Sequence, residues 1–190
     1  MKIQGAALVL VLCGCSKTAE PTSSTSATAT PVGSPTPTPT PTPSSDLRWD
    51  VPPTWQTAPS PSAMRKATYK IPKAAGDAED AEVSVTQAGG SIDANIDRWV
   101  GQFAGSKDTL KRQEKRVGTF KVTIVDLKGK FAGSGMPGAA PAGPKENWAL
   151  LGAIVEGADP PYFFKLTGPE KTVTSARPDF DRLVGSLRAK

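Results

Sequence analysis

The sequence predicts an α+β fold, in which helices pack on an antiparallel β-sheet, preceded by an export signal and a long tether. Three observations predict it. Across residues 46–190, short segments with alternating or continuous apolar residues follow one another at hairpin spacing. Two further segments of this region carry an apolar stripe with helical periodicity. Residues 1–45 instead have a composition that does not form a packed core.

The first 14 residues have the pattern of an export signal. Lys2 supplies a positive charge, and residues 5–12 form a short apolar run. This run is too short to cross a bilayer as a helix, which takes about 20 residues. Residues 12–15, Leu-Cys-Gly-Cys, resemble the lipobox of bacterial lipoproteins, with Cys15 as the residue to be lipidated. Cys13 does not fit, because a leucine would then directly precede the cysteine.

The lipobox resemblance implies that residues 1–14 are removed and that Cys15 carries the acyl chains that attach the protein to a membrane. Two or three acyl chains give stable anchoring where one does not. The implied localisation is the bacterial cell envelope. Ser16, which is not Asp, favours the outer membrane facing the periplasm if the cell has two membranes. A plain signal peptide or an uncleaved anchor is the alternative interpretation.

Residues 15–45 are predicted to form the lipidated end and a disordered tether. Residues 16–45 contain seven Ser, nine Thr and seven Pro, so they cannot bury enough apolar surface to offset chain ordering. The Pro-Thr repeat over 35–43 favours polyproline II, and at about 3.1 Å per residue the tether reaches up to about 90 Å. A proline-rich ligand for a partner and an O-glycosylated stalk are the alternatives.

Residues 46–190 are predicted to be one globular α+β domain built around an antiparallel sheet. Two of its predicted strands, residues 66–71 and 82–87, alternate between apolar and polar residues. Residues 148–155 are almost continuously apolar, which is typical of a central strand covered on both faces. Residues 130–131 extend a hairpin. The predicted strands are residues 47–51, 66–71, 82–87, 111–117, 119–127, 148–155 and 162–166.

Two helices are predicted to pack on this sheet. Ser91 is a favourable N-cap for the first, which continues to a stop at Gly105. The second is predicted over residues 169–187, where Pro178 is expected to break or kink it. The apolar stripe of the first helix consists of Ile92, Ile96, Trp99, Val100 and Phe103.

The composition excludes several classes of enzyme and metal site. The chain has no His, and its two Cys both lie in the first 15 residues. Catalysis by Ser-His-Asp or Cys-His and zinc sites that need His are therefore excluded. We assign no catalytic residue, no metal ligand and no cofactor, and we expect a protein that is not an enzyme. Residues 46–190 carry 21 Lys and Arg against 17 Asp and Glu, which gives little reason to expect nucleic acid.

Four segments of the domain resemble an uncharacterised group of bacterial exported proteins and lipoproteins. They are residues 64–69, 80–85, 95–103 and 163–169, and the third contains Arg-Trp-Val-Gly-Gln-Phe. The strand order and the closing Gly-Pro before a helix are also similar to the PsbP-like α/β/α sandwich. The resemblance implies an extracytoplasmic accessory or binding module with a protein partner in the envelope, and it brings no catalytic residue.

The candidate binding site consists of Trp55, Arg65, Arg98 and Gln102. Trp and Arg are enriched where proteins bind partners. Arg98 and Gln102 lie four residues apart on the first predicted helix, so they share a face beside its apolar stripe. Arg65 begins the next predicted strand after Trp55. The alternative is that these residues make ordinary structural contacts.

Three other features have a functional and a structural interpretation. The carboxylates Asp77, Glu79, Asp80 and Glu82 suggest calcium, but their spacing does not match an EF-hand, and a solvated turn is the alternative. The basic residues over 111–116 suit an anionic lipid or polymer, or an edge strand that lysine protects from aggregation. Residues 132–145 form either a tolerated insertion or a loop that gates a partner or ligand.

These observations favour a membrane-anchored extracytoplasmic lipoprotein that acts as a non-catalytic protein-binding or assembly accessory module. The alternative is a lipoprotein that binds a small ligand or a cell-wall polymer. The expected partners are the membrane, through the lipid on Cys15, and a protein of the envelope.

Overall fold

The structure is a computed structural model that describes residues 46–104, 106–132 and 143–190. The predicted export signal, the lipidated Cys15 and the tether lie outside the described residues. The same holds for Gly105 and for residues 133–142 of the predicted loop over 132–145.

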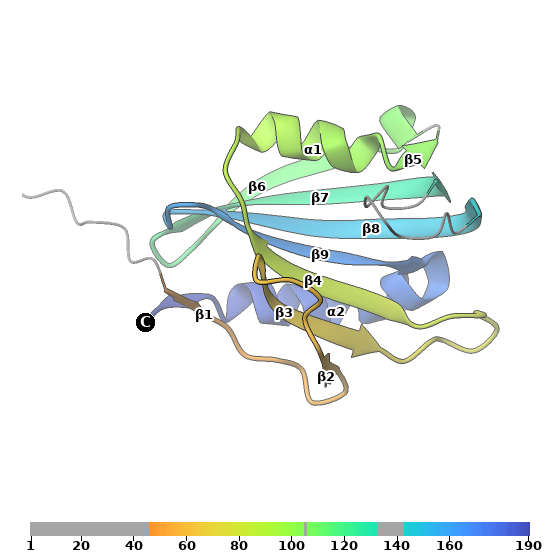
Figure 1. Cartoon of the computed structure of the whole chain (residues 1–190), viewed down its shortest axis with the longest axis horizontal. Coiled ribbons are helices and arrows are strands. Elements are labelled where there is room, and N and C mark those ends of the chain that lie inside the picture. Colours follow the sequence, from red (N-terminus) through yellow and green to blue (C-terminus); the bar gives the residue numbers. More distant parts are fainter. Residues whose placement is uncertain (1–45, 105, 133–142) are drawn as a thin grey trace, which may run out of the picture. The chain divides into compact units, whose positions relative to one another are not determined.

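An eight-stranded antiparallel sheet dominates the described domain (Figure 1). Its strand order is β2-β3-β4-β9-β8-β7-β5, and β6 also pairs with β7. A separate two-stranded sheet joins the two ends of the domain, β1 (Leu47–Arg48) and β10 (Arg188–Ala189). The strands of the large sheet are β2 (Gln56–Ala58), β3 (Arg65–Ile71), β4 (Ala81–Gln87), β5 (Phe103–Ala104), β6 (Lys111–Val117), β7 (Phe120–Phe131), β8 (Lys145–Glu156) and β9 (Tyr162–Pro169).

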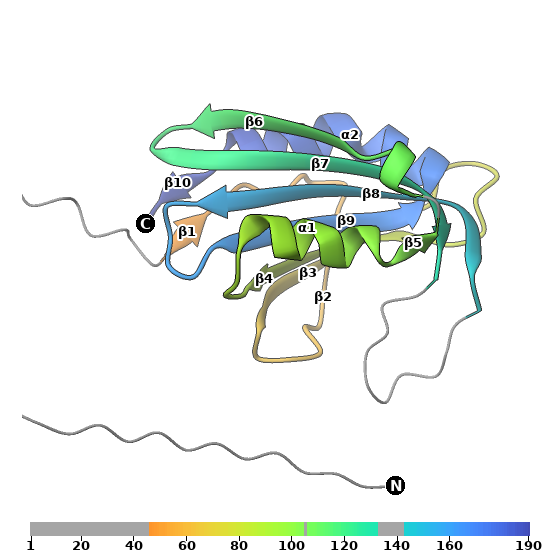
Figure 2. The same cartoon turned by 90° about the horizontal axis from the view of Figure 1, so that it is seen from above.

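One helix covers each face of the sheet (Figure 2). α1 (Ile92–Val100) packs on one face and α2 (Glu170–Gly185) on the other, and a short 3₁₀ helix (Ser106–Asp108) precedes β6. The α1-side core includes Trp99, Val125, Leu127 and Phe163. The larger α2-side core includes Val83, Val85, Phe164, Phe180 and Leu183. The predicted α+β class with helices on an antiparallel sheet is therefore confirmed.

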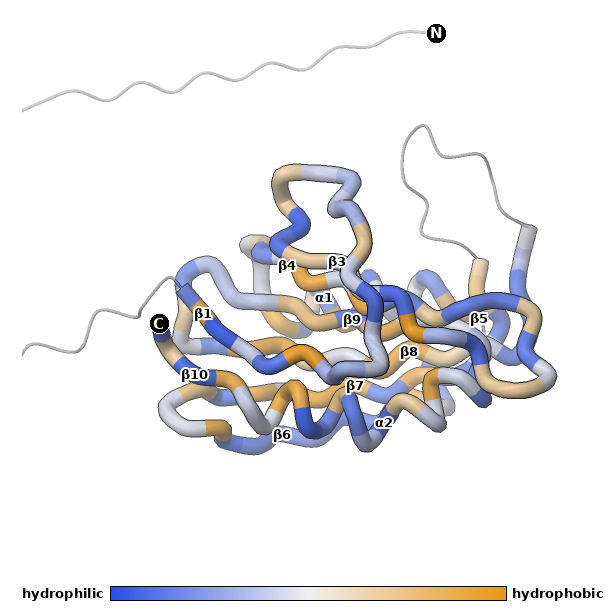
Figure 3. The backbone as a smooth tube through the Cα atoms, turned by 90° about the horizontal axis from the view of Figure 1, so that it is seen from below, coloured by the Kyte–Doolittle hydropathy of each residue, from blue (hydrophilic) through white to orange (hydrophobic). Residues whose placement is uncertain are grey.

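β8 is the central strand that its continuous apolar sequence predicts. It lies between β7 and β9, and alternate residues enter the two cores. Leu151 and Ala153 belong to the α2-side core, whereas Leu150 and Ile154 belong to the α1-side core. Hydrophobic segments accordingly lie along the inner strands of the sheet in Figure 3.

The first helix begins where the sequence predicts and ends earlier. The Ser91 side chain accepts a hydrogen bond from the backbone N–H of Ala94. The helix ends at Val100 with Gly101 as its C-cap, not at Gly105. It ends there because Phe103–Ala104 leaves the helix to form β5 against the end of β7.

The second helix is continuous through Pro178, so of the two outcomes expected there, a break or a kink, the break does not occur. Pro178 has no backbone N–H to donate to the carbonyl of Thr174, the residue four positions earlier. Both residues are exposed, so water can satisfy the freed carbonyl of Thr174. The helix is held by its opposite face, where Phe180 and Leu183 are buried in the α2-side core.

The shortest strands are predicted from the sequence only in part or not at all. The predicted strand over 47–51 is reduced to Leu47–Arg48, and β2, β5 and β10 have two or three residues each. Such segments are too short to show alternation, and their extended form depends on a partner brought from elsewhere in the chain.

Candidate functional site

A register shift in β3 turns Arg65 toward the α1 side of the sheet. Ala67, Tyr69 and Ile71 of this strand face the α2-side core, and regular alternation would place Arg65 with them. A bulge between Arg65 and Ala67 interrupts the alternation. The guanidinium of Arg65 therefore reaches the carboxylate of Glu82 on β4, at 2.8 Å.

Lys165 stands beside this ion pair on the neighbouring strand, β9. Its chain neighbours Phe164 and Leu166 enter the α2-side core, so Lys165 projects from the α1 side. Its Nζ donates a hydrogen bond to Oε1 of Gln102, which follows α1, at 3.3 Å. The side chains of Arg65, Glu82, Gln102 and Lys165, together with that of Thr167, are called the Lys165 site below.

The lysine of this site is partly buried, and this lowers the pKa of its amine to about 8. The nearby positive charge of Arg65 contributes to this lowering of the pKa, whereas the carboxylate of Glu82 opposes it. Among the described residues no carboxylate lies within ion-pair distance of Lys165. The site therefore holds two cations and one carboxylate, and that carboxylate is bound to Arg65.

Thr167 adds a hydrogen-bonding group without a partner. It lies directly opposite Glu82 in the β4–β9 register, and it projects from the same side as Lys165 because it is two residues further along the strand. Its Oγ1 is buried and has no hydrogen-bond partner among the described residues. A buried hydroxyl without a partner is costly, by about 1–3 kcal/mol, so a hydrogen-bond partner for this hydroxyl would offset that cost.

The structure separates the four predicted site residues. Arg65 and Gln102 both lie at the Lys165 site. Arg98 is exposed on α1 and donates a hydrogen bond to Oδ1 of Asn95 at 2.9 Å. Trp55 is only 6 % exposed and belongs to the α2-side core, where its ring packs against Tyr69. The four residues therefore do not form one surface.

Sequence reasoning missed Lys165, the centre of the site. Lys165 is the one charged residue in the run Tyr-Phe-Phe-Lys-Leu over 162–166. A lysine in a strand that is otherwise apolar was the available signal. The sequence could not show that Gln102 and Arg65 come from two distant segments to meet it.

The crowded carboxylates of the β3–β4 turn each have a separate partner. Asp77 caps α2, because its Oδ2 accepts hydrogen bonds from the backbone N–H and the hydroxyl of Thr172, at 2.9 and 2.6 Å. Glu79 pairs with Lys145 at 2.5 Å. Within the described ranges, no group of three or more acidic or Cys side chains is placed to hold a metal ion.

A polar groove runs beside α2 on the opposite face of the sheet. Its larger part has a volume of about 860 Å³ and is lined by the β3–β4 turn, β7 and the first turns of α2. A neighbouring hollow of about 400 Å³ shares Lys128 with it and extends to Lys111 on β6. Ion pairs of Lys128 with Glu170 and of Arg177 with Asp126 cross the groove.

Comparison with known proteins adds no family to these observations. No family model matches this chain, and the comparison with curated proteins gives no match. In the described part of the chain, no helix combines the length and the apolar character that a membrane crossing requires. The geometry of the sites is therefore the basis for the functional proposal.

The lowered pKa of Lys165 predicts a pH dependence of stability. In the unfolded chain the amine has an ordinary lysine pKa, about 10.4, so the unfolded state binds more protons between pH 8 and that value. The free energy of unfolding of the wild type should therefore rise with pH across this window relative to Lys165→Met. Urea unfolding of the full chain at pH 7.5, 9 and 10 measures the difference.

The matched control is Lys171→Met, because Lys171 is an exposed lysine on α2. Its pH dependence should follow the wild type. Equal pH slopes for the wild type and Lys165→Met would contradict the assigned burial of the amine.

Proposed function

We propose that this chain is a lipid-anchored, extracytoplasmic binding module of the bacterial cell envelope that docks a protein partner through a carboxylate. The proposal places the anchor on Cys15, with residues 16–45 as the tether that sets the domain's reach. It also takes the domain to have the PsbP-like sandwich arrangement, which the helix on each face of the sheet supports.

The charge balance of the Lys165 site is the observation that carries this proposal. Glu82 neutralises Arg65, and Lys165 has an amide oxygen as its partner. A partly buried charge without a counter-ion is costly, and a carboxylate from outside offsets that cost. An entering carboxylate can accept a hydrogen bond from the Lys165 amine.

The charged side chains of the Lys165 site already have partners within the protein, and this supports binding in preference to catalysis. A general base must be held ready to take a proton from a reacting atom. The carboxylate of Glu82 is already bound to the guanidinium of Arg65 at 2.8 Å. The cationic groups can attract and orient an anion, and this is the role we assign to them.

A second candidate function is the binding of a small ligand or a cell-wall polymer in the groove beside α2. The volume of about 860 Å³ favours it, since this is within the range of small-molecule sites. Lys128 and Lys171 line this groove, so it also suits a ligand with anionic groups.

Native mass spectrometry of the full chain, extracted gently from its own envelope, tests the two candidates. The wild type is expected to carry a stoichiometric second protein, and Lys165→Met should lose it because the counter-ion for the partner's carboxylate is removed. The control Lys171→Met should keep the partner.

Other outcomes would support the second candidate function or contradict the first. A small bound mass that persists in Lys165→Met would support the groove beside α2. A wild-type protein that carries no second protein, or a partner equally bound by Lys165→Met, would contradict docking at the Lys165 site.

A further inference from the structure

The outer edge of β6 is the longest unpaired strand edge of the described domain. All seven residues of β6 pair with β7, from Lys111 opposite Asp126 to Val117 opposite Phe120. In the described part of the chain no strand lies on its other side, whereas β2 at the opposite end of the sheet has three residues (Figures 1 and 2). A free strand edge presents unpaired backbone N–H and C=O groups.

The net positive charge of the domain is concentrated at this edge. Residues 106–131, which contain the β6–β7 hairpin, have eight Lys and Arg against three Asp and Glu, a net charge of +5. Residues 46–190 have a net charge of +4, so the remainder of the domain carries −1. β6 is accordingly hydrophilic along nearly all of its length (Figure 3).

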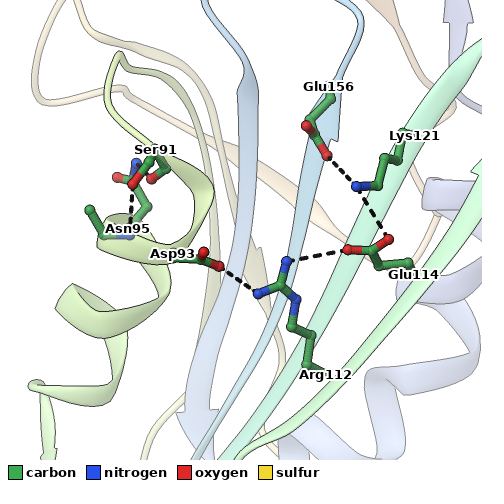
Figure 4. Close-up of polar contacts among 8 residues, drawn as sticks. Ser91, Asp93, Asn95, Arg112, Glu114, Lys121 and Glu156 are labelled. Atoms are coloured by element: carbon green, nitrogen blue, oxygen red, sulfur yellow. Dashed lines mark hydrogen bonds and ion pairs between the residues drawn. The ribbon is translucent and has the colours of Figure 1, made fainter.

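Part of this charge is already neutralised within the domain (Figure 4). Arg112 pairs with Asp93 on α1 at 2.6 Å and with Glu114 at 3.3 Å. Lys121 pairs with Glu114 at 3.2 Å, and this hydrogen bond lowers the pKa of the Glu114 carboxyl. These ion pairs connect the side of β6 that faces α1 to α1 and to β7.

Three cations of β6 have no carboxylate partner among the described residues: Lys111, Lys115 and Arg116. Lys111 and Lys115 share the α2 side of the strand, because Lys111 lines the hollow beside Arg177 of α2. Gln113 lies between them. Four residues along a strand span about 13 Å, which matches positions i and i+4 of a neighbouring strand.

The segments of this chain that the structure does not describe contain too few acidic residues to pair with the cations of β6. Residues 1–45 contain one acidic residue, Glu20, and residues 133–142 contain none. Neither of these two segments supplies an acidic complement for β6, so we look for it in another molecule. A lipid headgroup can match the charge alone, whereas an extended polypeptide can also pair with the row of backbone groups.

We propose that β6 accepts an extended acidic segment of another protein as an additional strand, with carboxylates at positions i and i+4 that pair with Lys111 and Lys115. A small polar residue at i+2 would face Gln113. The surface is separate from the Lys165 site, because β7 and β8 lie between β6 and β9. This inference therefore does not depend on docking at Lys165.

A fluorescent peptide with the core Glu-Val-Thr-Val-Glu tests the inference on the full chain. Fluorescence anisotropy should show binding, and amide hydrogen exchange should show new protection in β6. A control peptide with Pro in place of each Val keeps the charges but cannot pair as a strand, so it should bind at least about tenfold more weakly.

Substitutions in the protein test the charge match. The double variant Lys111→Glu with Lys115→Glu should bind the peptide about tenfold or more weakly, since each cross-strand pair becomes repulsive. Lys111→Gln with Lys115→Gln, which removes the charges without reversing them, should show a smaller loss. Lys66→Glu with Lys70→Glu changes the net charge equally at exposed sites on β3 and should bind within about twofold of the wild type.

Three results would overturn the inference. Equal binding of the Pro peptide would show that charge alone attracts the ligand. Binding of vesicles that contain anionic lipid through Lys111 and Lys115, with no peptide protection of β6, would make this edge a membrane contact. Absence of any peptide binding would leave β6 as an edge that its lysines protect from pairing.

Discussion

Replacing Cys15 by alanine is expected to abolish the membrane attachment of this protein. The lipobox resemblance implies that the sulfur of Cys15 carries the diacylglycerol thioether, and no other residue of residues 1–45 fits the lipobox pattern. Each buried CH₂ of an acyl chain contributes about 0.8 kcal/mol to membrane binding, so the anchor accounts for essentially all of the attachment. Radiolabelled fatty acid and membrane fractionation of cells that express the full chain measure both consequences.

The matched control is Cys13→Ala, which changes the neighbouring cysteine two residues away. Cys13 leaves with the signal peptide under this assignment, so the variant should be acylated and retained like the wild type. Normal membrane partition of the Cys15→Ala chain would refute the lipobox and, with it, the proposed anchoring.

Replacing Gly152 by valine is expected to cause a large loss of stability. A Cβ at Gly152 would lie 2.3 Å from Cζ3 of Trp99 and 3.0 Å from its Cη2. The Trp99 ring cannot simply move aside, because it packs edge-on against Phe163 with ring centroids 6.1 Å apart. Overpacking of this kind typically costs about 1–3 kcal/mol and occasionally more.

Urea unfolding of the full chain measures this effect, with Gly152→Ala as the milder variant. Gly185→Ala is the control, because Gly185 lies in α2 and a Cβ there meets nothing within 4 Å. Alanine is the better helix former, so this control should be neutral or slightly stabilising. A Gly152→Ala chain as stable as the wild type would show that α1 is not held against β8 as described.

The same close approach links the core to the Lys165 site. Gly152 lies directly opposite Lys165 in the β8–β9 register, and the Trp99 ring covers it. Because glycine has no side chain, α1 comes close to the sheet at this point. Gln102, which follows α1, can then reach the amine of Lys165.

Secondary structure was largely predictable because its signals are local. Alternation over 66–71 and 82–87 predicts β3 and β4, and the continuous apolar run at 148–155 predicts a central strand. Ser91 marks the start of α1 through its own hydrogen bond to Ala94. The break expected at Pro178 does not occur. Proline disfavours a helix interior, but the packing of α2 on the sheet outweighs this local effect.

The candidate site was only half predictable. Arg65 and Gln102 were chosen from the sequence, and both lie at the Lys165 site. Trp55 was chosen as a surface residue and is buried, since a tryptophan beside prolines gives no local sign of which face it will join. Lys165 was overlooked because its role depends on neighbours about 60 and 100 residues earlier in the chain.

The order and type of the longer elements follow from local patterns in the sequence, because hydrophobic period and helix caps depend on residues close together in the chain. Which side chains meet depends instead on tertiary contacts. The bulge beside Arg65, the unpaired outer edge of β6 and the glycine beneath Trp99 follow from how strands pair and helices pack. These arrangements join distant segments, and no pattern within one segment encodes its partner.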